Sequence, residues 1–240
     1  MSQAQPITDQ RVISYLALRK AIGLIGILLP FVLAGAYMLV VSKIIVRASI
    51  SDYYYTAMRN VLVGDLCAIG VFLFAYRGYN RWDNLFTNAA GIFAIGVAFC
   101  PTAPPDPSPL ATAAGYAHLA FAGLLFSMLA VIALFLFTKT DCPGQRPREK
   151  RSRDVVYRAC GGVIVACLAL VPVGSFVLGA AVAQYQPLFW LEAVAVVAFG
   201  IAWLVKGQAI LKDPAGPAAG RGGSGPPPAD SSRVLVSQDH

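Results

Sequence analysis

Charged side chains are scarce in this chain. Asp, Glu, Lys and Arg together make up 13% of the residues, whereas hydrophobic residues make up 57%. Soluble domains carry about a quarter charged residues, so this composition excludes an ordinary soluble enzyme or binding domain. The chain has two histidines, His118 and His240, and no C-x-x-C spacing among its five cysteines. A Cys/His zinc site is therefore not expected, and we predict no metal and no cofactor.

Long apolar runs are abundant. Six of them approach the ~20 residues that a helix needs to cross ~30 Å of hydrocarbon. They lie at about 21–42, 58–76, 85–102, 115–138, 158–181 and 188–205. Because the connections between them are short, neighbouring helices are expected to pack antiparallel. The sequence therefore predicts an all-α fold, a polytopic membrane bundle of six transmembrane helices.

The regions outside the bundle follow from composition. Residues 1–20 are a polar N-terminal lead-in, and residues 21–212 form the predicted transmembrane domain. Residues 213–240 are rich in Gly, Pro, Ala and Ser, which cannot bury a core, so we expect a disordered tail.

The basic residues predict the orientation. All but three of the 19 Lys and Arg precede the first run, follow the sixth, or lie in the second and fourth connections. The alternate connections hold only Lys43, Arg47 and Arg59. By the positive-inside rule, both termini lie in the cytoplasm.

The most polar stretch at a predicted membrane boundary reads Ser49-Ile50-Ser51-Asp52-Tyr53-Tyr54-Tyr55, and Arg59 and Asp65 follow it. The predicted orientation places it outside the membrane, so its charges do not serve topology. One interpretation is an interfacial turn whose tyrosines belong to an aromatic belt. The other is a surface that binds a ligand or a partner.

Three predicted spans each carry one titratable residue at similar depth: Asp65, His118 and Glu192. Asp65 lies about seven residues, or ~10 Å, below the predicted outer boundary of the membrane. His118 and Glu192 lie within about one helical turn of that boundary. Ionisable groups at membrane depth are functional candidates. We predict that these groups converge in an outward-facing polar pocket with Ser51, Asp52 and Arg59 at its rim. The candidate ligand-binding residues are Ser49, Ser51, Asp52, Tyr53, Tyr54, Tyr55, Arg59, Asp65, His118 and Glu192.

Three functions fit this pattern. The favoured one is a protein that binds or handles the headgroup of a lipid or other amphiphile. A proton-coupled transporter or channel is an alternative, although the predicted inner half offers no ionisable path. A membrane-embedded hydrolase is another, in which His118 with Asp65 or Glu192 supplies acid and base and Ser49 or Ser51 supplies the nucleophile, but no nucleophile signature supports an enzyme.

The expected partners are membrane lipids. Anionic lipid is a further candidate partner at residues 139–158, a stretch that contains seven basic and three acidic residues. Nucleic acid is not expected, since no suitable fold or aromatic interleaving is present.

The stretch Ser49–Tyr55, then Cys67–Phe74, Tyr76–Tyr79, Phe189–Glu192 and Trp203–Gly207, resembles a group of uncharacterised bacterial six-helix membrane proteins known as a domain of unknown function. That group is distantly similar to the Frag/DRAM/Sfk proteins, whose wider clan is associated with lipid remodelling. The resemblance covers about residues 15–213. It implies an integral protein of the bacterial cytoplasmic (inner) membrane and favours lipid handling, but it carries over no catalytic residues.

Overall fold

The computed structural model describes residues 6–78, 80–104, 106–139, 148–173 and 182–210. These residues contain helices and no strand: α1 (Pro6–Val41), α2 (Arg59–Ala75), α3 (Arg81–Phe99), α4 (Pro109–Val131), α5 (Arg148–Pro172) and α6 (Pro187–Lys206). The predicted all-α fold is confirmed, and each predicted apolar run overlaps one of the six helices. The predicted tail, residues 213–240, lies outside the described residues.

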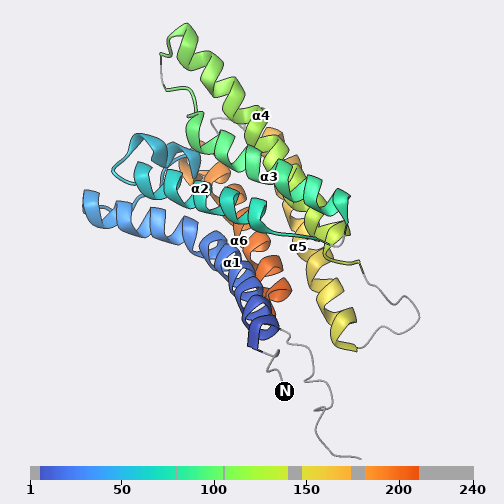
Figure 1. Ribbon diagram of the computed structural model, residues 1–240. Coiled ribbons are helices and arrows are strands. Elements are labelled where there is room, and N and C mark those ends of the chain that lie inside the picture. Colours follow the sequence, from blue (N-terminus) through green and yellow to red (C-terminus); the bar gives the residue numbers. More distant parts are fainter. Residues whose placement is uncertain (1–5, 79, 105, 140–147, 174–181, 211–240) are drawn as a thin grey trace, which may run out of the picture.

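Four helices, α1, α3, α4 and α5, begin at least four residues earlier than the apolar runs indicated. α1 starts at Pro6 and continues through the predicted lead-in, because proline favours the first helical turn and no glycine or further proline follows until Gly23. α4 starts at Pro109, and the Ser108 hydroxyl accepts a hydrogen bond from the Ala111 amide, which caps the helix. Pro30 lies inside α1, and Figure 1 shows that this helix bends along its length.

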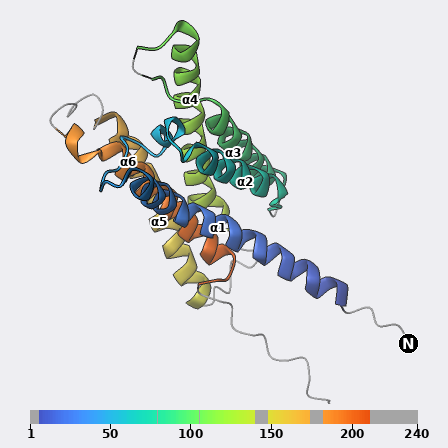
Figure 2. The same ribbon diagram turned by 90° about the vertical axis from the view of Figure 1, so that its left-hand side faces the viewer.

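The helices follow one another around a ring. Each packs mainly against its neighbours in the chain, and α6 closes the ring by packing along α1 (Figures 1 and 2). Figure 2 shows α2 and α3 running side by side. Between α4 and α5, the π-helical turn η2 (Ile132–Leu136) ends the fourth helix.

Glycines allow the closest helix contacts. A Cβ atom at Gly200 of α6 would lie 2.6 Å from the Gly23 carbonyl oxygen of α1. Similarly, a Cβ atom at Gly91 of α3 would lie 2.8 Å from the Gly70 carbonyl oxygen of α2. Small residues of this kind let helix backbones approach directly, which is how membrane helices associate.

The outward surface of every helix carries large apolar side chains. One exposed example from each helix in turn is Phe31, Val71, Ile92, Leu119, Val165 and Val194. Four segments are long and apolar enough to cross a membrane: Tyr15–Val41, Pro109–Leu136, Lys150–Pro172 and Pro187–Lys206. α2 has 17 residues and α3 has 19, and neither meets that criterion. A bundle that is apolar inside and outside is suited to lipid rather than water.

The glycine contact between α1 and α6 gives a stability prediction. In the Gly200→Ala variant the new methyl group forces the two backbones apart, so we expect a loss of about 1–3 kcal/mol and a lower thermal unfolding midpoint in detergent. Gly123→Ala is the matched control, because nothing lies within 4 Å of its Cβ position. Equal midpoints for the two variants would contradict this account of the packing.

Candidate functional site

Residues 47–59, which we call the cap segment, join α1 to α2 and contain a short 3₁₀ helix, η1 (Ser51–Tyr55). The segment is attached to the first two turns of α6 by two hydrogen bonds. The Phe189 amide donates to the Ala48 carbonyl oxygen at 3.1 Å, which satisfies a helix-terminal N–H that has no partner within α6. The Ile50 amide donates to the Glu192 carboxylate at 2.6 Å, and the Ser51 amide also faces this carboxylate.

His118 attaches the cap segment to α4. Its Nδ1 atom lies 2.6 Å from the Cys100 carbonyl oxygen, and its Nε2 atom lies 3.0 Å from the Ser51 hydroxyl oxygen. A carbonyl oxygen can only accept, so Nδ1 carries the proton. In the neutral imidazole Nε2 is then the acceptor, and Ser51 donates to it. The ring is 4% exposed.

The three tyrosines of the cap segment have different surroundings. Tyr53 is fully buried, and its ring lies edge-on to Tyr37 of α1 at 5.5 Å. Burial raises the pKa of the Tyr53 phenol, so the group stays neutral. Tyr55 is exposed and donates its hydroxyl proton to the Thr102 carbonyl oxygen, which ties the cap segment to the connection between α3 and α4. Tyr54 lies edge-on to Tyr55.

The charged residues of the cap segment pair within it. Arg47 donates from Nη2 at 2.7 Å and from Nε at 2.9 Å to one carboxylate oxygen of Asp52. Arg59 stacks on the Tyr54 ring, with its guanidinium carbon 4.2 Å from the ring centroid. The Ser49 hydroxyl accepts from the Asp52 amide at 3.0 Å. These contacts shape the segment, and none of these charged groups lines the cavity beneath it.

A cavity of about 60 Å³ lies under the cap segment, inside the ring of helices. Its two polar lining residues are Ser51 and Glu192. The rest of the lining is apolar and comes from the cap segment and five helices: Leu29, Ile50, Leu62, Leu66, Ile69, Val97, Ala122, Leu125, Phe126, Leu129, Val196 and Phe199. The site is therefore an apolar slot with polar groups at one end.

Comparison of the chain with protein-family models, with curated proteins and with solved structures found no match. Within the described part of the chain, no group of three or more His, Cys, Asp or Glu side chains is placed to hold a metal ion.

The structure brings together only two of the three titratable residues of the predicted spans. His118 and Glu192 both bind the cap segment, at Ser51 and at Ile50. Asp65 does not join them, contrary to our prediction. It is partly exposed, and the cavity is lined by Leu62, Leu66 and Ile69 of the same helix instead. At ~100° per residue, Asp65 lies about 60° from Leu62, 100° from Leu66 and 40° from Ile69, so it falls at the edge of the face that lines the cavity and not at its centre.

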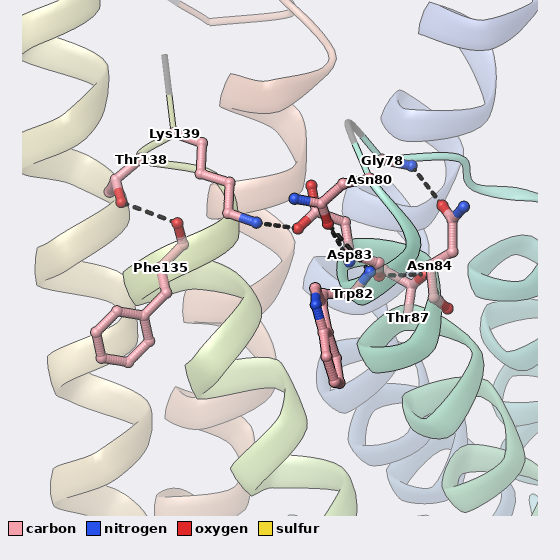
Figure 3. A network of polar contacts seen from close by, with 9 residues as sticks. All are labelled: Gly78, Asn80, Trp82, Asp83, Asn84, Thr87, Phe135, Thr138 and Lys139. Atoms are coloured by element: carbon pink, nitrogen blue, oxygen red, sulfur yellow. Dashed lines mark hydrogen bonds and ion pairs between the residues drawn. The ribbon is translucent and has the colours of Figure 1, made fainter. Parts of the chain in front are cut away.

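A second polar cluster, which no pattern in the sequence predicted, surrounds the start of α3 (Figure 3). Asp83 is 1% exposed and forms an ion pair with Lys139, which joins α3 to the segment after η2. The Asn80 side chain caps α3 by accepting from the amides of Trp82 and Asp83, both at 3.0 Å. Asp83 lies just before the third predicted apolar run, a position where an acidic side chain is expected to be solvated at the membrane boundary. The Asn at the position before the helix was the available signal.

The attachment of the cap segment to Glu192 gives a second prediction. Replacing Glu192 with Leu leaves the Ile50 amide without its acceptor, at a cost of about 1–3 kcal/mol. We expect hydrogen exchange at residues 50–52 to become faster, measured by mass spectrometry of the purified protein. Glu192→Gln is the control, since its side-chain oxygen still accepts a hydrogen bond. Unchanged exchange in the Leu variant would mean that this bond does not hold the segment.

Proposed function

We propose that this protein is a six-span membrane protein, with both termini in the cytoplasm, that holds an amphiphile in the cavity under the cap segment. The polar end of the amphiphile lies near Ser51 and Glu192, and its apolar part lies among the helices. Lipid binding and the bacterial inner membrane belong to the same proposal. The resemblance to the bacterial six-helix group is in keeping with it and stays a prediction.

The exposed apolar side chains on α2 and α3 support six spans rather than four. Val71 and Ile92 are each more than half exposed on the outside of the ring, where water would penalise them. At ~1.5 Å per residue, the 17 residues of α2 reach about 25 Å, which a locally thinned or tilted arrangement accommodates. The uneven distribution of Lys and Arg supports the orientation.

The length and the apolar lining of the cavity support a hydrocarbon chain as the apolar part of the ligand. Its lining spans residues 62–69 of α2, 122–129 of α4 and 192–199 of α6. Seven residues of helix correspond to about 10 Å, so the cavity is about that deep. A volume of about 60 Å³ over that depth makes a narrow slot. That volume is below the about 150 Å³ of a cavity that takes one benzene, so the side chains that line the slot must move apart to admit a chain.

The packing below the cavity favours holding a ligand over transporting one. Leu73 and Trp203 are fully buried toward the Asp83 end, and the Trp203 ring lies edge-on to Tyr76 and Phe137 at 5.0 and 5.1 Å. A transported solute would have to separate these rings.

The predicted contact of residues 139–158 with anionic lipid stays a prediction, because residues 140–147 lie outside the described part of the chain.

Filling the slot tests the proposed function. In the Ala122→Phe variant the new ring occupies the cavity, so we expect at least a tenfold loss of co-purified lipid, measured by native mass spectrometry after mild detergent extraction. Ala120→Phe is the matched control, because Ala120 is exposed on the same helix and does not line the cavity. Equal lipid retention in both variants, with unchanged unfolding midpoints, would refute a ligand in the cavity.

Reporter fusions test the orientation. A green fluorescent protein fused after residue 240 is expected to fluoresce, because it folds in the cytoplasm. Alkaline phosphatase fused after Asp106 is expected to be active, because that connection lies outside. The reverse pattern of fluorescence and phosphatase activity would overturn the predicted topology.

A further inference from the structure

We infer that Ser51 and His118 form a nucleophile and general-base pair that cleaves an acyl ester whose chain lies in the cavity. This inference rests on the proposed function, because it concerns the same cavity and names the class of its substrate. It goes beyond binding in assigning a covalent step to one hydroxyl.

The hydrogen-bond pattern around His118 is the first support. Nδ1 is fixed as the protonated nitrogen by the Cys100 carbonyl oxygen at 2.6 Å, so Nε2 presents a lone pair to the Ser51 hydroxyl at 3.0 Å. A serine becomes a nucleophile when an adjacent base accepts its proton and a third group orients that base. Here the base is buried, its neutral form presents Nε2 to Ser51, and the orienting group is a backbone carbonyl. The pair comes from segments 67 residues apart in the chain.

The position of Ser51 is the second support. Ser51 lines the cavity, whereas the neighbouring Ser49 is buried and its hydroxyl accepts from the Asp52 amide. A hydrocarbon chain in the apolar slot would bring the bond at its polar end to Ser51. That geometry favours esters or thioesters with an apolar acyl chain over water-soluble esters, since a polar acyl group would make no favourable contact with the apolar lining.

The reaction balances without a cofactor. The Ser51 oxygen attacks the acyl carbonyl carbon while its proton passes to Nε2 of His118. The bond from that carbon to the alcohol oxygen breaks, and the alcohol leaves with the proton from Nε2. Water then attacks the acyl-serine with the same base, releases the fatty acid, and returns a proton to Ser51.

Oxyanion stabilisation requires donors near the same hydroxyl. Two backbone donors on the same segment are the amides of Ile50 and Ser51, which face the Glu192 carboxylate. An acyl carbonyl oxygen that displaces this carboxylate would receive the same donors.

A covalent probe tests the inference on the full-length protein in detergent. A fluorophosphonate with a long alkyl chain loses fluoride when a serine attacks its phosphorus, and the modified residue is located by peptide mass spectrometry. We expect labelling at Ser51, loss of that label in Ser51→Ala and Ser51→Cys, and a decrease of about 100-fold or more in the labelling rate of His118→Gln. Ser127→Ala is the control, because Ser127 bonds the Gly123 carbonyl oxygen within α4.

The pH dependence separates catalysis from a structural role. The labelling rate of the unmodified chain is expected to increase with pH as the imidazole loses its proton, and the rate in His118→Gln is expected to lose that dependence. If Ser51→Ala fails to fold, the labelling of Ser51→Cys tests the nucleophile instead, because cysteine is nearly the same size as serine. Absence of labelling in a protein that retains lipid would overturn the nucleophile and leave the proposed function standing. Absence of both would overturn both.

Discussion

The arrangement at one end of this bundle depends on a carboxylate that needs donors. Glu192 lies in the second turn of an apolar helix and lines an apolar cavity. A carboxylate in such surroundings is costly unless it receives hydrogen bonds. The amide of Ile50 supplies one, which requires the chain between α1 and α2 to fold back over α6. The same fold-back gives the Phe189 amide its acceptor and brings Ser51 to His118. One electrostatic requirement thus joins three helices through the cap segment.

The cavity is a consequence of this closure. The glycine contacts, such as Gly23 of α1 with Gly200 of α6, bring neighbouring helices of the ring together. They do not draw the helices toward the centre of the ring. The side chains that point inward under the cap segment leave a narrow space. Farther along the bundle, Trp203 and its aromatic neighbours fill the same position completely. The ring is therefore hollow under the cap segment and filled at the other end.

The two ends also treat charge differently. At the Asp83 end, a buried acid is neutralised by Lys139, and the contact holds α3 against the segment after η2. Removing Lys139 would weaken the compensation of this buried charge. In the cap segment, Arg47 and Asp52 pair in a more exposed position, where an ion pair contributes at most about 1 kcal/mol. The cap segment is held by its hydrogen bonds to Glu192 and His118 more than by its ion pairs.

The sequence alone determined the helices and the region of the candidate site. Apolar runs of span length identify helices because the main chain must satisfy its own hydrogen bonds in lipid. The polar residues at 49–59 were recognisable because charge is rare elsewhere in the chain. Only the tertiary structure decided which of those groups meet. Ser51, His118 and Glu192 converge and Asp65 does not, because rotation about each helix axis and the path of the cap segment set side-chain directions. Asp83 became a buried ion-pair partner for the same reason: its lysine comes from a segment 56 residues away, a distance that no local pattern encodes.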